Sequence, residues 1–431
     1  MPTKTRTRRT RTTARARSAP NTLLKHRTSL ARPQADPNDR PSPSPRLTRY
    51  IGLDVHAETI AVAIAEPTNV VHAYGTIPNT PDAVRALMKR LTRDGATLAV
   101  CYEAGPMGYG LYRQLHAMDI HCDVIAPSLI PKAVGDHIKT DRRDAQKLAR
   151  WYRSGNLTPV WVPDEAHEAL RDLVRAREGA LEDRTRARHR LTKCLLRHRL
   201  HRPPGINAWT MRHRAWLVQV IKHPTLHVDA LQITLHEYLH EIDRCTERLA
   251  RYDTAIAAAV RQADPVTQAL IAGLQCLRGV QLLTAVTLVT ELGQLSRFPR
   301  PAQLMAYAGL VPREHSSGTK IRRSGITKCG NTHLRRILVE AAWSYRHPPA
   351  LSAGLRLRQR GQPPTVIAIA WQAQQRLSVR YRALAQRKKP LPQIMTALAR
   401  ELLGFIWAIG VDIEGTFERT RERTTTRGAR P

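Results

Sequence analysis

The order of short apolar segments after Arg49 is the feature that most constrains the fold. Residues 50–54, 59–65 and 70–76 each predict a strand, and too few residues separate them for a helical crossover, so they must pair as an antiparallel meander. Residues 81–92, 97–102, 106–118 and 122–126 then alternate helix, strand, helix and strand. Alternation of this kind predicts parallel pairing, so the folded part of the chain begins with a mixed α/β sheet.

A further helix, residues 141–153, completes this first domain. A meander followed by alternating helices and strands is the element order of an RNase H-like fold, although the periodicity also allows other α/β sheets. We assign residues 49–162 to this domain.

Two long helices are expected next. Asp164 follows Pro163 and predicts the N-cap of a charged helix that ends near Leu200, with a broken apolar stripe. The second helix carries apolar residues at alternating spacings of three and four, which is a coiled-coil seam. Its members are Leu235, Tyr238, Ile242, Cys245, Leu249, Tyr252, Ile256 and Ala259. An antiparallel helical hairpin over residues 163–265 is the simplest arrangement, and the seam could also join two protomers.

The remaining sequence predicts a mostly α-helical C-terminal domain over residues 266–410, with helices at 332–345, 365–386 and 392–409. Residues 277–293 resemble one helix-hairpin-helix element, whose turn would offer backbone N–H groups to phosphate. Gln281 stands where that motif has a second glycine, so a plain loop into a core helix explains the segment equally well. We expect the basic tail, residues 411–431, to be loose.

The charge identifies the class of partner. The chain has 69 Lys and Arg against 35 Asp and Glu, a formal charge of +34, which excludes an ordinary metabolic enzyme and predicts a polyanionic partner. Thirteen of these cations lie in the first 49 residues, with two acids. We expect residues 1–48 to form a disordered, dispensable DNA-binding arm, against the alternatives of a misassigned start or an Arg-rich leader.

Neither a membrane nor an oxidising compartment is indicated. Uncharged stretches fall short of the ~20 apolar residues that span a bilayer, and the first residues have no secretory apolar core. The six cysteines are far apart and form no CxxC pair, which argues against a zinc site and a disulfide framework. We expect a cytoplasmic protein that has no contact with a membrane.

Four carboxylates occupy positions where a reaction centre can form. Asp54 ends the first strand and Glu103 ends the fourth, so neighbouring parallel strands deliver both to one edge of the sheet. Asp141 and Asp144 are three residues apart at a helix start, which puts them on one face. We expect all four to converge.

Carboxylates held this close repel one another unless a hard cation lies among them. Mg²⁺ or Mn²⁺ is the natural choice, and two such ions can assist phosphoryl transfer. Each residue also has an ordinary explanation. Asp141 and Asp144 suit a helix N-terminus. Asp54 could be a turn residue or the phosphate-site Asp of an actin-like ATPase, and Glu103 could be merely exposed. The order Asp, Glu, Asp, Asp favours the metal centre.

At these motifs the sequence resembles the DEDD insertion-sequence transposases of the IS-one-ten group, whose catalytic domain is RuvC-like. The N-terminal motifs that carry the resemblance are GLDVH at residues 52–56, YEAGPMGYGL at 102–111 and KTDRRDA at 139–145. The C-terminal motifs are LMAYAGLVP at 304–312, HSSGT at 315–319 and GITKCGN at 325–331. The resemblance implies a metal-binding tetrad of Asp54, Glu103, Asp141 and Asp144.

The same resemblance implies a catalytic serine just before the glycine of the Ser-Gly step, which here is Ser317. Ser316 precedes it, so the assignment is ambiguous by one position, and both could be turn formers. A serine nucleophile would attack a DNA phosphate and free a 3′ hydroxyl. Nearby cations that could bind phosphate are Lys320, Arg322, Arg323, Lys328 and Arg335, although a solvated basic face would look the same.

The resemblance also implies a structured guide RNA encoded beside the gene. We further expect a homo-oligomer, a dimer or a tetramer, on DNA. Aromatic residues make up 5% of the chain, so charge and A-form shape are the expected means of RNA recognition. The alternatives are a structure-selective endonuclease similar to a Holliday junction resolvase, which would use water in place of Ser317, and a non-catalytic nucleic-acid-binding protein.

Overall fold

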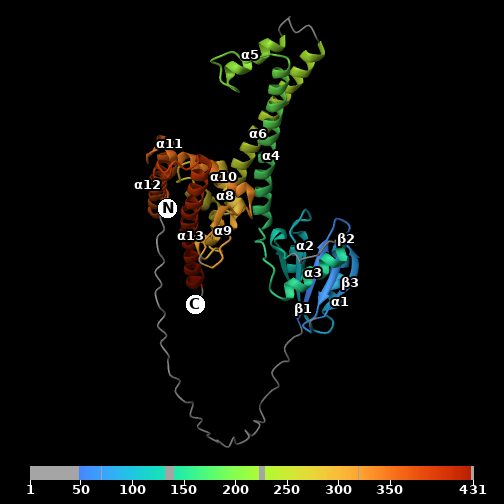
Figure 1. Cartoon of the computed structure of the whole chain (residues 1–431). Helices are drawn as coiled ribbons and strands as arrows, with labels where there is room; N and C mark the ends of the chain where they lie inside the picture. Colours follow the sequence, from blue (N-terminus) through green and yellow to red (C-terminus); the bar gives the residue numbers. More distant parts are fainter. Residues whose placement is uncertain (1–47, 69, 132–139, 223–228, 319, 429–431) are drawn as a thin grey trace, which may run out of the picture.

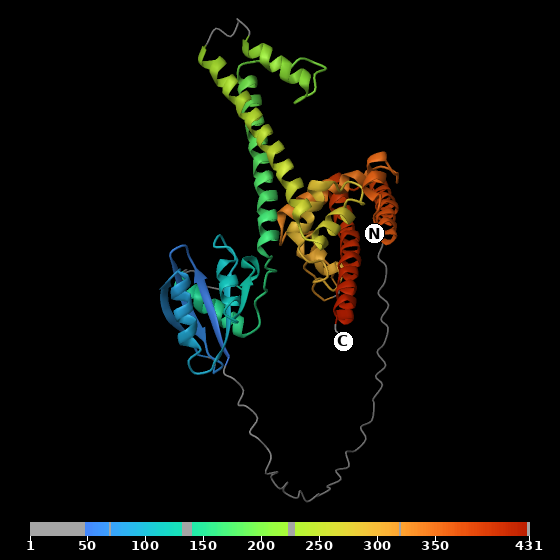
Figure 2. The same cartoon turned by 180° about the vertical axis from the view of Figure 1, so that it is seen from behind.

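The structure, a computed structural model, describes residues 48–68, 70–131, 140–222, 229–318 and 320–428. Figure 1 shows an α/β domain, a long pair of helices and a helical domain. The expected basic arm lies outside the described residues, except for Thr48 at the start of the first strand. Both domains lie near one end of the long helix pair, whose other end projects away from them in both views (Figures 1 and 2).

The α/β domain is built on a five-stranded sheet in the order β3-β2-β1-β4-β5. The first three strands are antiparallel, whereas β4 is parallel to β1 and β5 is parallel to β4. The strands are β1 (Thr48–Val55), β2 (Thr59–Ala65), β3 (Val71–Pro78), β4 (Thr97–Glu103) and β5 (His121–Ile125). The predicted mixed sheet is confirmed.

The two faces of the sheet are covered by different helices because side chains alternate along each strand. On β2, Ile60, Val62 and Ile64 share a core with the apolar faces of α1 (Pro81–Leu91) and α2 (Gly110–His116). The intervening Ala61, Ala63 and Ala65 pack with Ala145 and Ala149 of α3 (Asp141–Arg153). A short 3-10 helix, η1 (Pro127–Leu129), follows β5. Small side chains on both surfaces let α3 lie close to the sheet.

The long helix pair consists of α4 (Glu165–Arg197) and α6 (Asp229–Gln262). Asp164 caps α4 as predicted, because its Oδ1 accepts a hydrogen bond from the His167 N–H at 2.7 Å. Ion pairs join Arg177 to Asp253 and Asp183 to Arg248. Residue numbers that rise on one helix and fall on the other show that the pair is an antiparallel hairpin.

The buried residues of α6 include five of the predicted seam: Leu235, Ile242, Cys245, Leu249 and Ile256. On α4, the gaps in the expected leucine stripe are filled by Ala180 and Ala187, which are buried. Alanine at these positions keeps the helices close, which a search for large apolar residues does not detect.

The connection between α4 and α6 contains a helix that the sequence analysis did not predict, α5 (Met211–Lys222). It follows the segment with Pro203, Pro204 and Gly205. Leu217 and Ile221 of α5 are buried in a cluster with α4 and α6, so this end of the hairpin has a small core of its own.

The helical domain packs around one large core. Its elements are α7 (Pro265–Leu274), α8 (Leu282–Leu292), α9 (Pro301–Tyr307), β6 (Pro312–Glu314), β7 (Arg323–Ile326), α10 (Thr332–Ala342), η2 (Trp343–Arg346), α11 (Ala353–Gln359), α12 (Pro364–Gln386) and α13 (Leu391–Gly428). The segment that leads from the α/β domain into α4 contacts this domain through Trp161, whose ring occupies the space where a Cβ on Gly293 would lie, at 2.6 Å.

The expected loose tail is wrong for residues 411–428, because α13 continues through them. Glu414 is buried, and its carboxylate accepts hydrogen bonds from the N–H groups of Leu295 and Ser296 at 2.8 and 2.7 Å. Within the described residues, α13 is the helix that is long and apolar enough to span a bilayer. Half of that stretch is buried in the protein, as expected for the central helix of a folded core.

The turn between α7 and α8, which resembled a helix-hairpin-helix element, is packed into the domain. Leu277 and Val280 are fully buried. Gly279 has φ of 81°, and a Cβ there would lie 2.6 Å from the carbonyl oxygen of Ala341. The glycine is therefore required for close packing against α10.

Candidate active site

Strand β1 delivers Asp54 to the carboxyl-terminal edge of the sheet, where the chain turns toward β2. The side chain of Asp54 is 21% exposed. The turn is fixed because the His56 N–H donates to the Thr59 carbonyl at 2.9 Å and the Asn79 amide donates to the His56 carbonyl at 2.7 Å. Asp54 and His56 are thus held on a short, hydrogen-bonded turn.

Helix α3 begins beside this turn, and Gly52 determines how close it comes. A Cβ on Gly52 would lie 2.4 Å from both the Ala145 carbonyl oxygen and the Ala149 backbone nitrogen, so only glycine allows α3 to pack directly on β1. The first turn of α3 carries Asp141 and Asp144, and Thr140 caps it through a hydrogen bond from the Arg143 N–H. Close packing of this helix brings its carboxylates to Asp54.

The resulting cluster combines Asp54, His56 and Asp141. The His56 Nε2 lies 3.5 Å from Asp54 Oδ2 and 3.5 Å from Asp141 Oδ1, and one potential ligand atom from each residue lies within 4.8 Å of the other two. Burial raises the pKa of Asp54, and the neighbouring carboxylates of Asp141 and Asp144 raise it further against the opposing effect of His56. Negative charge at this edge is therefore incompletely neutralised by the protein.

Asp144 approaches this cluster but has its own partner. Its Oδ1 accepts a hydrogen bond from Lys147 Nζ, one turn along α3, at 3.1 Å. Asp144 is close enough to raise the pKa of Asp54, but its carboxylate is not one of the three groups whose ligand atoms meet.

Glu103 ends β4, the strand next to β1, one residue beyond the pairing of Tyr102 with Leu53. Its side chain is exposed and makes no ion pair with any described residue. It shares the sheet edge with Asp54, as the sequence predicted, but its carboxylate does not belong to the cluster of three.

The donor set suits a divalent cation. Two carboxylates and one imidazole nitrogen meet, and the Asp144 carboxylate is near enough to raise the pKa of Asp54. Glu103 ends the neighbouring strand β4. Hard divalent cations prefer carboxylate oxygen. Burial is the main cause of the raised pKa of Asp54, and repulsion from Asp141 and Asp144, which such a cation would relieve, adds to it.

The second candidate group, Ser317, lies on the hairpin formed by β6 and β7 in the helical domain. The backbones of Ser317 and Lys320 exchange hydrogen bonds of 3.1 and 3.2 Å, and Gly318 has φ of 58°, which suits a tight turn. The Ser317 side chain is exposed, and its hydroxyl makes no hydrogen bond with the described residues.

Ser316 differs from Ser317 in its hydrogen bonding. Its hydroxyl donates to Glu314 Oε1 at 2.8 Å and accepts from the Arg322 N–H at 3.3 Å. A hydroxyl with both roles filled is committed to holding the hairpin together, whereas that of Ser317 is available for another partner.

The basic residues near the hairpin divide into two kinds. Lys320, Arg322 and Lys328 are exposed, and the side chain of Arg323 lies outside the described part of the chain. Arg335 is half-buried, and its Nη1 donates to the carbonyls of Ala308, Cys329 and Gly330 at 3.0–3.2 Å. These bonds hold the segment before α10 in place.

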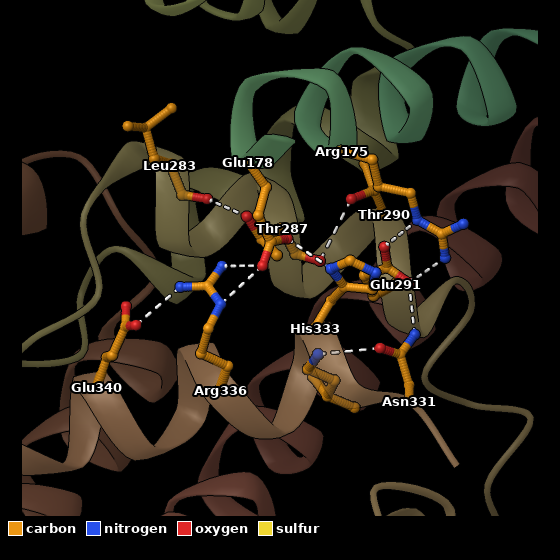
Figure 3. Close-up of polar contacts among 11 residues, drawn as sticks. Arg175, Glu178, Leu283, Thr287, Thr290, Glu291, Asn331, His333, Arg336 and Glu340 are labelled. Carbon is orange, nitrogen blue, oxygen red and sulfur yellow. Dashed lines mark hydrogen bonds and ion pairs between the residues drawn. The ribbon is translucent and has the colours of Figure 1, made fainter. Parts of the chain in front are cut away.

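A buried polar network connects this region to the long hairpin (Figure 3). The carboxylate of Glu291 on α8, 1% exposed, accepts two hydrogen bonds from Arg175 of α4 and one from Asn331. Asn331 also caps α10, because its side chain accepts the Leu334 N–H. Burial alone would raise the pKa of Glu291, but Arg175 and Asn331 outweigh it and hold that pKa below its usual value.

A second carboxylate of the network lies on α4. Glu178 accepts hydrogen bonds from His333 and from Arg336, both on α10, and Arg336 also bonds Glu340 (Figure 3). Burial opposes ionisation of Glu178, but Arg336 and His333 hold its pKa below the usual value. The β6–β7 hairpin that carries Ser317 is called the serine hairpin here. Helix α10, which follows it, is therefore fixed to α4 at two points.

Sequence reasoning did not identify His56, Lys147 or this network. His56 belongs to the GLDVH motif, and a residue two positions after Asp54 on an extended chain points to the same side, so the spacing could have identified it. Glu291 gave no such signal, because it lies inside an apolar helix far along the chain from Arg175.

Two family models match this chain. One, for transposases of the DEDD type in IS110 elements, matches residues 51–199, which include Asp54, Glu103, Asp141 and Asp144. The other, described as transposase IS116/IS110/IS902 family, matches residues 272–354, which include Ser317. The protein named "Putative transposase y4qE" of Sinorhizobium fredii is 43% identical over 371 residues, 85% of this chain and 90% of its own length. The chain belongs to the IS110 transposase family.

Other relatives of this transposase agree. The "Transposase for insertion sequence element IS1533" of Leptospira borgpetersenii is 33% identical over 79% of this chain and 98% of its own length. The "Pilin gene-inverting protein" of Moraxella lacunata is 26% identical over 56% of this chain and 64% of its own length. The expected family is confirmed, and with it a transposase that acts on DNA.

Proposed function

We propose that this transposase cuts and rejoins DNA strands with a divalent-metal centre at Asp54, Glu103, Asp141 and Asp144 and with Ser317 as the nucleophile. The observation that carries the proposal is the meeting of Asp54, His56 and Asp141 at one edge of the sheet, with Asp144 close enough to raise the pKa of Asp54. His56 joins the proposed ligands. The strand order β3-β2-β1-β4-β5 supports an RNase H-like, RuvC-like fold for residues 49–162.

The proposed reaction is a phosphoryl transfer. The Ser317 hydroxyl loses its proton as its oxygen forms a bond to a DNA phosphorus, the bond from phosphorus to the 3′ oxygen breaks, and that oxygen takes up a proton to become a 3′ hydroxyl. In the reverse direction a 3′ hydroxyl attacks the phosphoserine and restores a DNA strand. When bound, Mg²⁺ or Mn²⁺ would supply neutralisation of phosphate charge. The exposed Lys320 and Arg322 lie beside Ser317 along the chain and would bind phosphates.

A phosphoserine bond conserves the energy of the cut DNA strand for rejoining. Rejoining is consistent with the name of one relative, which refers to inversion of a gene. The carboxylates and Ser317 belong to two domains, so we propose that a homo-oligomer, a dimer or a tetramer, assembles them on DNA. The seam of α6 supports a coiled coil within the hairpin. The charge of +34 supports a structured guide RNA as a second partner. We also propose a cytoplasmic location.

The test combines the purified chain, RNA transcribed from the DNA that flanks its gene, Mg²⁺ and labelled donor and target duplexes. We expect recombined strands and a covalent protein–DNA adduct. Asp54→Asn and Ser317→Ala should each abolish both, whereas the matched variants Asp82→Asn, on an exposed carboxylate of α1, and Ser324→Ala, on the same hairpin, should keep both.

Each alternative has its own outcome. Full strand cleavage by Ser317→Ala, with none by Asp54→Asn, would establish a nuclease that uses water. Loss of the adduct in Ser316→Ala but not in Ser317→Ala would move the nucleophile by one position. If the protein binds DNA but shows no metal-dependent cleavage under any condition, it is a non-catalytic nucleic-acid-binding protein. Turnover of ATP would indicate an actin-like ATPase.

A further inference from the structure

We propose that the end of the long hairpin farthest from both domains is a binding site for folded RNA that presents an unpaired nucleotide. This region, residues 184–222, is called the tip here and comprises the last turns of α4, the connection and α5. It contains eleven Arg or Lys and no Asp or Glu. Figures 1 and 2 show α5 folded back beside α4 and α6 at this end.

Most of the cations in the tip are not neutralised by the protein. Arg186 pairs with Glu182 and Asp183, and Arg214 pairs with Asp243. The other nine make no ion pair with any described residue: Arg184, Arg188, Arg190, Lys193, Arg197, Arg199, Arg202, Arg212 and Lys222. Nearer the domains, by contrast, Arg175 and Arg177 of the same helix are paired with carboxylates. Uncompensated positive charge of this density attracts a polyanion.

A groove of about 420 Å³ lies within the tip, between α5 and the two long helices. One wall is aromatic. The guanidinium carbon of Arg188 lies 4.7 Å from the centre of the Trp209 ring, His213 meets that ring edge-on, and Trp216 stacks on His213. Met211, 81% exposed, borders the same groove. Bases stack on aromatic rings and on arginine guanidinium planes.

Trp209 is held in an unusual backbone conformation, with φ of 64°. Glycine adopts this region freely, whereas a tryptophan there is strained. The backbone N–H of Trp209 donates to His213 Nδ1 at 3.1 Å, which fixes the turn. Strain of this kind is retained where a side chain has a use, and here it turns the indole toward the groove that it lines.

The opposite wall explains why a base, and not a phosphate, would enter. Thr246, Asp243 and Glu247 of α6 line it. The Glu247 carboxylate makes no ion pair with a described residue. A carboxylate repels phosphate but accepts hydrogen bonds from the amino and imino groups of a base. The groove therefore suits a base, and the cations around it suit the backbone that carries that base.

These requirements favour folded RNA over two other partners. Duplex DNA keeps its bases stacked, whereas RNA loops and bulges present unstacked ones. A second copy of this chain is a poor partner for the tip, since every copy has a charge of +34. The inference deepens the proposed function, because it rests on the guide RNA suggested above and locates a contact for it away from the carboxylates.

The experiment measures binding of the full chain to three labelled probes: an RNA stem-loop with an unpaired loop, the same RNA fully paired, and a DNA duplex of equal length. Trp209→Gly removes the ring and relieves the backbone. It should weaken stem-loop binding about tenfold or more and leave both duplex affinities unchanged. Trp209→Phe should keep stem-loop affinity within about threefold. A 2-aminopurine in the loop should lose fluorescence on binding the parent but not Trp209→Gly.

A second pair of changes tests the charge. Arg190→Gln with Arg212→Gln should weaken the stem-loop and reduce the dependence of log affinity on log salt by about 1.4–1.8, for two lost phosphate contacts. The control, Arg387→Gln with Lys388→Gln, removes the same charge from the exposed end of α12 and should leave the slope unchanged.

Three results would overturn the proposal: equal weakening of all probes by Trp209→Gly, tighter binding of the DNA duplex than of the stem-loop, or self-association through the tip that Arg190→Gln and Arg212→Gln abolish. Failure here is separable from failure of the proposed function. Asp54→Asn should bind the stem-loop like the parent, and Trp209→Gly should keep Mn²⁺ binding at the carboxylates.

Discussion

The carboxylate cluster and the serine hairpin hold reactive groups in place by opposite means. Asp54 and Asp141 are positioned by backbone packed against backbone, because Gly52 leaves no space between β1 and α3. Ser317 lies on an exposed turn, and the helix after its hairpin is fixed to α4 through buried charges at Glu291 and Glu178. Steric packing fixes a site permanently, whereas ionic contacts between elements respond to pH and to partners. We therefore expect the proposed metal centre to be rigid and the proposed nucleophile, Ser317, to be adjustable.

Gly52→Ala should have the largest effect. The added Cβ would meet backbone atoms at 2.4 Å, and backbone cannot move aside as a side chain can. We therefore expect a loss at the upper end of the usual range for overpacking, about 3 kcal/mol, in the α/β domain. Displacement of α3 should also abolish Mn²⁺ binding, measured by calorimetry. Gly110→Ala, where a Cβ has open space, is the control. Normal metal binding by Gly52→Ala would show that the packing of α3 on β1 does not fix the carboxylates.

Arg175→Ala should affect the other region. It leaves the Glu291 carboxylate buried with Asn331 as its remaining partner, which we expect to cost about 2–3 kcal/mol, given that Arg175 itself is partly exposed. Urea unfolding should report the loss in the helical domain, and strand cleavage should fall while Mn²⁺ binding stays intact. Arg186→Ala, which breaks only exposed pairs on α4, should cost under about 1 kcal/mol. Equal losses in the two variants would contradict the network's importance.

Low pH should destabilise the helical domain through the two buried carboxylates of its network. The pKa values of Glu291 and Glu178 are held below the ordinary 4.5, so their contribution to stability is fully present above that pH. It is lost as pH falls through the lower, folded-state pKa values. We expect urea midpoints of the helical domain to fall by the equivalent of about 1–2 kcal/mol between pH 5 and 3. Glu291→Gln should reduce the dependence of the urea midpoint on pH. An unchanged pH dependence in this variant would show that Glu291 does not cause the loss of stability in acid.

The smallest effect has the opposite sign. Since the pKa of Asp54 is raised, its ionisation opposes folding above its ordinary pKa. In buffer with a chelator, Asp54→Asn should stabilise the α/β domain by about 1 kcal/mol at neutral pH, measured by thermal unfolding. A loss of stability would show that the Asp54 carboxylate serves the fold and not a site.

Much of the fold could be predicted because it follows local rules. Asp164 as N-cap of α4, the limits of α3 and the limits of β2 all depend on neighbours in sequence. Helix α5 and the continuation of α13 depend on tertiary contacts, such as the burial of Leu217 and the two backbone N–H groups that bind Glu414. The sequence carries no local signal for such contacts.

The candidate site shows the same division. Asp54 and Glu103 were predictable as strand ends on one edge, and Asp141 with Asp144 as one helix face. The exclusion of Glu103 from the cluster of three and the inclusion of His56 depend on side-chain directions, which spacing alone does not fix.

The length of the hairpin sets a distance between two events on nucleic acid. A helix of 33 residues is about 50 Å long at 1.5 Å per residue, which equals roughly fifteen base pairs at about 3.4 Å each. A nucleic acid bound at the tip is thus held about one hairpin length away from the proposed place of cutting. Removing two heptads from each arm would shorten the hairpin by about 21 Å. The position of the cut should then shift along the nucleic acid by a similar distance.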